Sequence, residues 1–418
     1  MKDENKKIIT GIDVGTTKVC VVTAACTEGK PIEILGVGKS PTKRLKKGVV
    51  ININDTVESI KKAVQQAETQ SGIPIESALI GISGEHIRGI NNTGVITVSK
   101  NSSRNPFDHE ITESDRNRVL EHAKSITLPA ERRILHVLSQ QYKVDNRNDI
   151  IDPIGMTGNR LEAKVHLIHS EIASEKNLIA CFDKAEIDII DFVLSPLASA
   201  YSVLDPNEKN LGVVLLDIGG GTTDVIVFYN GGIHHTGIIP IGGDTITSDI
   251  AHGAQTTIEL AEKLKCEYGI AKEALASEDE EISVPGIHGR ESKSISRRKL
   301  ASFIEPRLRE IMMFAQSEIR KSNHRGLFTF GIVITGGTAM MKNIEDLASD
   351  IFKYDIKVGI PMLSGGISDS IQDPTFSTAA GLIEFAVLNG DKYEEEDGIP
   401  GLLKSFSKRI KNLFENLY

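Results

Sequence analysis

LLDIGGGTTDVIVF, the stretch Leu215–Phe228, places three glycines and two threonines between two apolar runs. This order is typical of a β-hairpin whose turn lies against something bulkier than a side chain, because glycine has no Cβ. Backbone N–H groups and threonine hydroxyls in such a turn can point at one anion, and Asp217 can hold a hydrated divalent cation beside it. An ordinary glycine-rich turn is the alternative, although such glycines weaken strand ends without packing in return. The candidate anion-binding residues are Gly219, Gly220, Gly221, Thr222 and Thr223.

The same order occurs near the N-terminus in IITGIDVGTTKVCVVTAA. The aspartates of the two copies, Asp13 and Asp217, are 204 positions apart (217 − 13). This repetition predicts a duplicated domain that holds one anion between its halves. Lys18 stands where the second copy has Asp224 and could complement phosphate charge; a solvated strand residue is the alternative. The candidate phosphate-binding residues of the first copy are Gly15, Thr16, Thr17 and Lys18.

Composition limits the possible classes of function. The chain has 418 residues, of which 40% are hydrophobic and 25% charged, as in a soluble protein with more than one domain. Its net charge of −9 argues against a general nucleic-acid-binding protein. The four cysteines form no CxxC pair, which predicts reduced thiols in a cytoplasmic protein. No apolar run approaches the ~18 residues that span a bilayer.

A third glycine motif follows in FGIVITGGTAMMKNIEDLA, where a strand leads through Gly336, Gly337 and Thr338 into an expected helix. A helix N-terminus after such a turn can face an anionic or planar ligand. Because it comes after two phosphate hairpins, we interpret it as the support for a purine and ribose. Glu262 and Lys265 share one face of a predicted helix and could reach the ribose and base; a surface ion pair is the alternative.

In sequence order, IDVGTTK, LDIGGGTTD and VITGGTA resemble the phosphate 1, phosphate 2 and adenosine motifs of the actin, Hsp70 and sugar-kinase superfamily. More closely, nearly the whole chain resembles the FtsA family of bacterial cell-division proteins, through PLASAYSVL, PIGGDTITSDIA, KLASFIEPRLRE and DPTFSTAAGL. The PilM family of pilus-platform proteins shares the actin core and is the closest alternative. A phosphotransferase is the alternative from another class, although no spare carboxylate has a convincing context as its base.

The resemblance implies an α/β, two-lobed actin-like fold of duplicated ribonuclease-H-like domains, with an inserted subdomain and a C-terminal amphipathic helix. The expected divisions are 7–84, 167–196 and 373–390 for lobe 1, 85–166 for the insert, 197–244 and 303–372 for lobe 2, 245–302 for its small subdomain, 391–401 for an acidic linker and 402–418 for the helix. The implied cofactors are ATP and Mg²⁺, the latter held through water near Asp13 and Asp217. Related proteins carry a water-placing glutamate where this chain has Ser195, so we expect slow ATP hydrolysis at most.

The last residues, GLLKSFSKRIKNLFENLY, have an apolar stripe at helical spacing with basic residues beside it. Such a helix on an acidic, glycine-containing leash indicates membrane-surface binding; docking on another protein is the alternative. The apolar residues are Leu402, Leu403, Phe406, Ile410, Leu413, Phe414 and Leu417, and the basic residues are Lys404, Lys408, Arg409 and Lys411.

The family resemblance also implies partners. It places the binding site for the C-terminal tail of the tubulin-like protein FtsZ at Arg297, Arg298 and Lys299; a solvated basic face is the alternative. It further implies self-assembly on anionic lipid at the cytoplasmic face of the inner membrane and contact with later division proteins.

Overall fold

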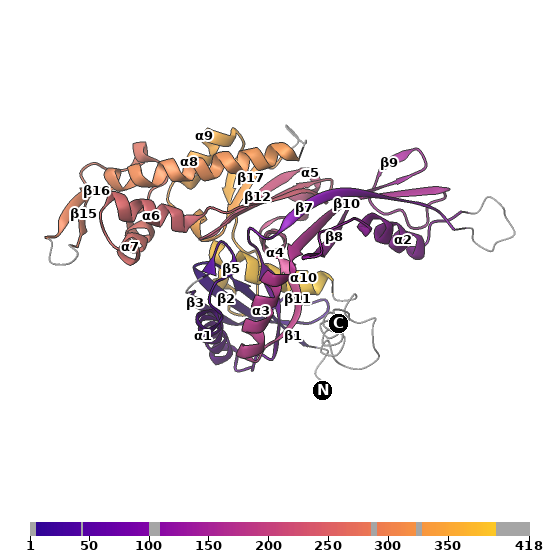
Figure 1. Ribbon diagram of the computed structural model, residues 1–418, viewed down its shortest axis with the longest axis horizontal. Helices are drawn as coiled ribbons and strands as arrows, with labels where there is room; N and C mark the ends of the chain where they lie inside the picture. Colours follow the sequence, from indigo (N-terminus) through magenta and orange to yellow (C-terminus); the bar gives the residue numbers. More distant parts are fainter. Residues whose placement is uncertain (1–5, 43–44, 100–108, 286–290, 323–327, 390–418) are drawn as a thin grey trace.

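The computed structural model describes residues 6–42, 45–99, 109–285, 291–322 and 328–389. Its architecture rests on two five-stranded sheets of the same topology (Figure 1). The first sheet contains β1 (Lys7–Val14), β2 (Lys18–Cys26), β3 (Glu33–Pro41), β6 (Ser77–Ile82) and β11 (Asp188–Leu194) in the order β11-β6-β1-β2-β3. The second contains β12 (Val213–Ile218), β13 (Thr223–Tyr229), β14 (Gly232–Ile239), β17 (Ile332–Thr335) and β18 (Ile356–Val358) in the order β14-β13-β12-β17-β18.

The strand directions repeat as well. In each sheet the first three strands in sequence pair antiparallel. The fourth strand pairs in parallel with the first strand, and the fifth pairs in parallel with the fourth. The duplication that the two glycine hairpins predict is therefore confirmed. Both hairpins lie where the sequence places them, one between β1 and β2 and the other between β12 and β13.

Lobe 1 is covered by α1 (Ile53–Ser71) and α3 (Ile172–Ala185) (Figure 1). The boundaries of α1 follow local rules, because the side chain of Asn52 caps its first turn and Gly72 ends it at φ 67°. Two further helices, α4 (Ser195–Val203) and α10 (Ser377–Leu388), cross between the lobes. A Cβ on Gly381 would lie 1.8 Å from the carbonyl oxygen of Ala198, so the crossing requires glycine there.

The insert is a four-stranded sheet with one helix on it. Its elements are β7 (Arg88–Thr97), α2 (Glu113–Lys124), β8 (Arg132–Val144), β9 (Arg147–Ile150) and β10 (Arg160–Glu171), with strand order β7-β10-β8-β9. Its last strand continues to Glu171, beyond the expected division at residue 166. Figure 1 shows the insert extending away from the hinge helices α4 and α10. It lies on the side opposite the small subdomain of lobe 2, residues 245–302, which we call the second small subdomain.

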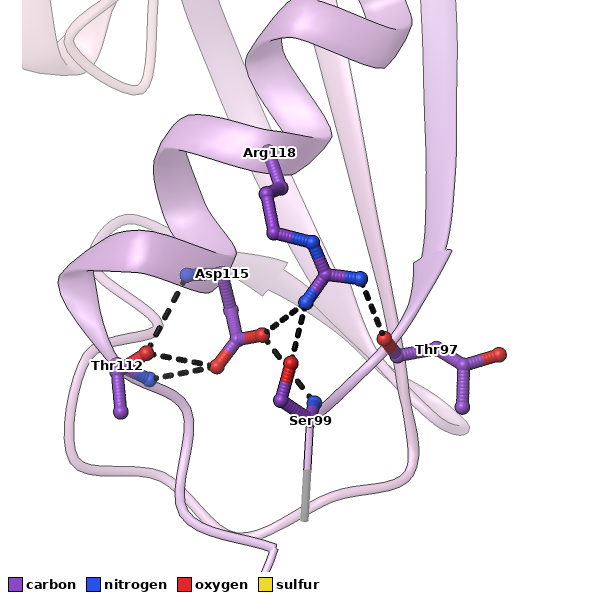
Figure 2. Close-up of polar contacts among 5 residues, drawn as sticks. All are labelled: Thr97, Ser99, Thr112, Asp115 and Arg118. Atoms are coloured by element: carbon purple, nitrogen blue, oxygen red, sulfur yellow. Dashed lines mark hydrogen bonds and ion pairs between the residues drawn. The ribbon is translucent and has the colours of Figure 1, made fainter. Parts of the chain in front are cut away.

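A buried carboxylate fixes the helix of the insert to its edge strand (Figure 2). Asp115 is 1% exposed and accepts hydrogen bonds from the hydroxyl of Thr112 and the backbone N–H of Ser99. Arg118 bonds Asp115 at 2.8 Å and the carbonyl oxygen of Thr97 at 3.3 Å. Burial alone would raise the pKa of Asp115, but the hydrogen bonds from Thr112 and Ser99 outweigh it and hold the pKa below its usual range.

Lobe 2 carries the remaining helices. They are α5 (Pro206–Leu211), α6 (Gly243–Gly253), α7 (Ile258–Tyr268), α8 (Arg297–Lys321) and α9 (Ile344–Phe352), with a short hairpin of β15 (Glu281–Val284) and β16 (Lys293–Ser296). The expectation of a helix directly after the third glycine motif is wrong. Residues Gly337–Met340 form a 3₁₀ turn, Met341 is extended, and α9 begins only at Ile344. Within the described ranges, no helix is both long and apolar enough to cross a bilayer.

Candidate functional site

The turns of the two hairpins face each other across the cleft between the lobes. Each turn is closed by a backbone hydrogen bond of 2.9 Å, from Gly15 to Lys18 in lobe 1 and from Gly219 to Thr222 in lobe 2. A Cβ on Gly220 would lie 2.3 Å from Thr17, and one on Gly221 would lie 2.5 Å from Thr16. The second turn therefore needs glycine at both positions, because the first turn occupies the space that side chains would fill.

A cavity at this meeting point collects most of the predicted phosphate site. The predicted residues that line it are Asp13, Gly15, Thr16, Thr17, Lys18, Asp217, Gly219, Gly220, Gly221, Thr222, Gly336 and Gly337. Ser83, Ser195, Asp224, Thr375 and Thr378 also line it and were not predicted to bind the ligand. The fold thus brings segments from both lobes and from α10 to one place.

Three carboxylates converge there. Burial raises the pKa of Asp13 to about 7; the nearby Lys18 ammonium lowers this pKa and the Asp217 carboxylate raises it. Burial also raises the pKa of Asp217, against hydrogen bonds from Ser199 and Thr378. The pKa of Asp224 is raised well above its ordinary value, first by burial and then by the charge of Asp217. Such a cluster is electrostatically unfavourable by itself and would be relieved by a cation.

Neighbouring hydroxyls hold these carboxylates in place. Ser199 on α4 donates to Asp217 Oδ2 at 2.7 Å and lies 2.9 Å from the hydroxyl of Thr378 on α10. Ser83 at the end of β6 donates to both oxygens of Asp224, at 2.8 and 2.7 Å, and so joins lobe 1 to lobe 2. The hinge helices and both lobes are therefore connected to the same group of carboxylates.

Lys18 lies in the cavity wall and not in open solvent. Its ammonium donates to the carbonyl oxygen of Thr375 at 2.9 Å. Burial lowers the pKa of Lys18, while the charges of Cys20, Asp13 and Asp217 raise it. The position fits the role of complementing phosphate charge.

The adenosine end of the predicted site is adjacent to this cavity. Glu262 and Lys265 form an ion pair of 2.6 Å, and Lys265 also donates to the carbonyl oxygen of Gly243 at 3.2 Å. A Cβ on Gly243 would lie 2.7 Å from the hydroxyl of Thr338. Glu262 and Lys265 are therefore an ion pair, as one interpretation expects. Their contact with a ribose stays a prediction.

Two predicted hydroxyls point away from the cavity. Thr223 is fully buried and donates to the carbonyl oxygen of Ile241 at 2.9 Å. Thr338 donates to the carbonyl oxygen of Gly219 at 3.1 Å. Thr338 therefore supports the glycine turn at Gly219, Thr223 holds the chain that follows β14, and neither side chain lines the cavity.

The donors present fit the phosphates of a nucleotide with magnesium. The glycine turns leave backbone N–H groups uncovered by side chains, one ammonium stands beside them, and Asp13 and Asp217 supply oxygen ligands. In the described part of the chain, no three His, Cys, Asp or Glu side chains could together hold a metal ion. Magnesium would therefore be held here by one or two carboxylates, water and phosphate oxygens, the usual arrangement for this ion.

The predicted partner-binding residues lie in the first turn of α8. Arg297 bonds the carbonyl oxygen of Tyr268 at 2.9 Å and pairs with Glu280 at 2.8 Å. Arg298 pairs with Glu278, and the ammonium of Lys299 lies 5.0 Å from the centre of the Phe303 ring. The basic cluster is therefore largely paired with acidic residues of its own subdomain. The predicted membrane-binding residues lie outside the described ranges.

The residues of the site that the sequence did not predict differ in whether a local motif marks them. Asp224 ends the GGGTTD motif and could have been found there. Ser83, Ser199 and Thr378 have no local signal, because a serine or threonine at the end of a buried strand or within a helix is common. They enter the site only through the crossing of the two lobes.

Known protein families and solved structures match most of this chain. A family model described as "Cell division protein FtsA" matches residues 214–381, and one described as "SHS2 domain inserted in FTSA" matches residues 84–169. Among solved structures, the PilM-PilN type IV pilus biogenesis complex aligns with TM-score 0.65 at 16% identity, covering 91% of this chain and 98% of the other. MreB5 of Spiroplasma citri bound to ADP aligns with TM-score 0.55 at 13% identity, covering 93% and 99%. These two likenesses show the actin-like fold alone.

Curated relatives decide between the families. The cell division protein FtsA of Pseudomonas aeruginosa is 38% identical over 98% of this chain and 99% of its own length. That of Escherichia coli K12 is 34% identical over 99% of this chain and 98% of its own length. Because these relatives match both the core and the insert from end to end, the chain belongs to the FtsA family of cell-division proteins.

Proposed function

We propose that this protein binds Mg-ATP in the cleft, assembles with copies of itself at the cytoplasmic face of the inner membrane, and anchors FtsZ filaments there, where it helps to recruit later division proteins. The observation that carries the nucleotide part is the single cavity lined by two glycine hairpins, three aspartates and Lys18. Family membership supports the division part. Co-sedimentation with anionic liposomes, with and without FtsZ and ATP, tests the whole proposal, and failure to carry FtsZ to the membrane would contradict it.

The roles of the residues follow from their positions. The N–H groups of both glycine turns bind the phosphates, Lys18 complements their charge, and Asp13 and Asp217 orient the water around magnesium. Bound magnesium supplies charge neutralisation between the carboxylates and the phosphates. The base lies toward Gly336, Glu262 and Lys265.

Hydrolysis is expected to be slow. Ser195 begins α4 at the cavity wall, where a general base would stand, and its hydroxyl cannot accept a proton at neutral pH. Asp13 and Asp217 remain to order water. Nucleotide then acts chiefly as a ligand that closes the cleft and favours assembly.

For the FtsZ tail, we expect that Arg298→Glu with Lys299→Glu weakens binding of the acidic peptide about tenfold at low salt, and less at high salt. We expect the opposite from Glu278→Gln, because it removes the acidic partner that now pairs with Arg298. Fluorescence anisotropy with the tail peptide measures both. Lys321→Glu, a reversal at the far end of α8, is the matched control. Unchanged affinity in the double variant would remove the assignment to this face.

For the membrane, we expect Phe406→Glu with Phe414→Glu to release the protein from anionic liposomes while ATP binding is kept. Four basic residues contribute at most about 1 kcal/mol each near an anionic surface, so the apolar stripe is needed as well. A single helix then binds reversibly, and assembly multiplies its affinity by ~100-fold or more.

The control for the membrane variant changes charge equally on the other side of the helix. Ser405→Glu with Asn412→Glu adds the same two charges at the polar face, by helical spacing. It should sediment with liposomes far better than the phenylalanine variant. If both double variants sediment alike, the stripe does not enter lipid and the tethering proposal fails.

A further inference from the structure

The insert grows out of lobe 1 but also rests on the edge strand of lobe 2. Its strands β7, β8 and β10 run past the lobe 2 sheet in Figure 1. There the buried ring of His166 on β10 lies 2.8 Å, through Nε2, from the hydroxyl of Thr236 on β14. Asn91 on β7 donates to the carbonyl oxygen of His234 at 3.2 Å. Gln140 on β8 donates to the carbonyl oxygen of Ile233 at 2.8 Å. Three of the four strands of the insert, β7, β8 and β10, thus bond the same strand of lobe 2.

The pairing registers show a β-bulge on each side of this contact, one in β8 of the insert and one in β14 of lobe 2. In β8, Ser139 and Gln141 pair with consecutive residues of β10, which leaves Gln140 as an extra residue. In β14, Ile233 and His235 pair with consecutive residues of β13, which leaves His234 as an extra residue. A β-bulge re-aims the groups of the extra residue. Two bulges on different subdomains therefore face each other, and each supplies a bonded group.

The backbones also approach closely enough to exclude side chains. A Cβ on Gly89 of β7 would lie 2.4 Å from the hydroxyl of Thr236 and 2.6 Å from His166 Nε2. A Cβ on Gly232 of β14 would lie 2.8 Å from the carbonyl oxygen of Gln140. Glycine on each side is required for the strands to meet at this distance.

One assignment of protons satisfies the whole junction. Asn91 Nδ2 donates to the carbonyl of His234, so its Oδ1 accepts from Gln140 at 3.1 Å and from His166 Nδ1 at 2.6 Å. The other ring nitrogen of His166 then accepts from the hydroxyl of Thr236. Burial lowers the pKa of His166 to about 3, helped by His235 and His234, so the ring is neutral as this pattern requires.

The strand that receives these bonds leads to the cleft. β14 pairs with β13 from Ile239 opposite Thr223 and Ile238 opposite Asp224, at the end of the phosphate hairpin. On the other side the insert is tied to lobe 1, because Arg133 of β8 pairs with Glu175 of α3 and His136 accepts from the backbone N–H of Leu194 at 3.0 Å. A rotation of either lobe must therefore strain or break one set of bonds.

We propose that this junction, made of Asn91, Gln140 and His166 against Ile233, His234 and Thr236, couples the orientation of the inserted subdomain to the opening and closing of the cleft. This proposal rests on the proposed function, because it assumes that nucleotide binds in the cleft. Closure of the cleft around a ligand then turns the insert. A partner that binds the turned insert therefore raises the affinity of the cleft for its ligand, and the ligand raises the affinity of the insert for the partner by the same factor.

Amide hydrogen exchange on the full-length protein tests the coupling. The variant is Asn91→Ala with Gln140→Ala, which removes the bonds to His234 and Ile233 and the acceptor of His166 Nδ1, but no core residue. The matched control is Gln141→Ala, the adjacent glutamine of the same strand, which pairs with Lys164 inside the insert. Without nucleotide, we expect roughly tenfold faster exchange in residues 88–92 and 232–239 of the double variant. We also expect faster exchange in residues 219–224, which no substituted residue touches. The control should match wild type.

Mg-ATP provides the second measurement. In wild type and in the control, we expect it to slow exchange in residues 88–97; in the double variant, calorimetry should still show binding while this slowing is lost. Coupling is overturned if residues 219–224 of the nucleotide-free double variant exchange as in wild type, or if ATP still slows the insert in that variant. If wild type binds no ATP, the proposed function fails, and the nucleotide-free exchange at 219–224 alone decides whether the junction couples.

Discussion

Gly336→Asp is expected to reduce Mg-ATP affinity by at least about 100-fold. Gly336 has φ 85° and ψ 169°, a region that only glycine adopts without strain of about 1–3 kcal/mol. A Cβ there would lie 2.3 Å from Asp217 Oδ1 and 2.7 Å from the carbonyl oxygen of Ile218. The new carboxylate would therefore displace Asp217, which we propose orients magnesium, and would add a fourth carboxyl group to the cleft.

A glycine outside the cleft supplies the control. Gly29, in the turn between β2 and β3, also has a positive φ, 72°, and a Cβ there would meet nothing within 4 Å. Gly29→Asp should bind Mg-ATP within about threefold of wild type, because it adds the same charge away from the cavity. Isothermal titration calorimetry measures both, and circular dichroism confirms that each variant is folded. Tight binding by folded Gly336→Asp would show that the nucleotide lies elsewhere.

The parts of the fold that sequence could predict are those with local causes. The two hairpins are specified by glycines between apolar strands, and the end of α1 by Gly72. The duplication follows because the motif occurs twice, and sheet order then repeats with it. Family resemblance placed the insert between β6 and α3, where it lies.

The parts that could not be predicted depend on contacts between distant segments. Ser83 reaches Asp224 across 141 positions of sequence, and Ser199 reaches Thr378 across 179. The sequence gives no partner for the basic residues at the start of α8, yet Glu280 and Glu278, in the loop before β15, pair with Arg297 and Arg298. The residues after Gly336 predict the start of a helix, because glycine and threonine suit a helix start as well as a tight turn. The extended conformation of Met341 ends the turn, so the helix begins later.

The carboxylate cluster at the cleft makes a second large effect testable. Asp13→Asn should stabilise the nucleotide-free protein at pH 8 and weaken Mg-ATP binding. Burial is the main reason why the pKa of Asp13 rises from its ordinary value of 3.8 to about 7 in the fold. Between these two values the folded protein holds more protons than the unfolded chain, so stability falls as pH rises through this window and is level above it.

The size of the effect follows from the shift. The rise of this pKa from 3.8 to about 7 corresponds to at most ~4 kcal/mol above pH 7, and because water in the cavity screens the charge we expect roughly 2 kcal/mol. Asparagine carries no charge, so the variant should gain this amount at pH 8 and almost nothing at pH 4. Asp279→Asn, at an exposed site in the second small subdomain, should change neither value.

Urea unfolding at pH 4 and pH 8 measures the stability difference, and calorimetry measures the loss of nucleotide affinity. Mg-ATP should stabilise wild type more than Asp13→Asn, because magnesium removes the repulsion among Asp13, Asp217 and Asp224 only where Asp13 is charged. A variant that is less stable than wild type at pH 8 would show that Asp13 supports the fold and does not strain it. Equal affinity for Mg-ATP in both proteins would remove Asp13 from the magnesium site, while the hairpins could still bind phosphate.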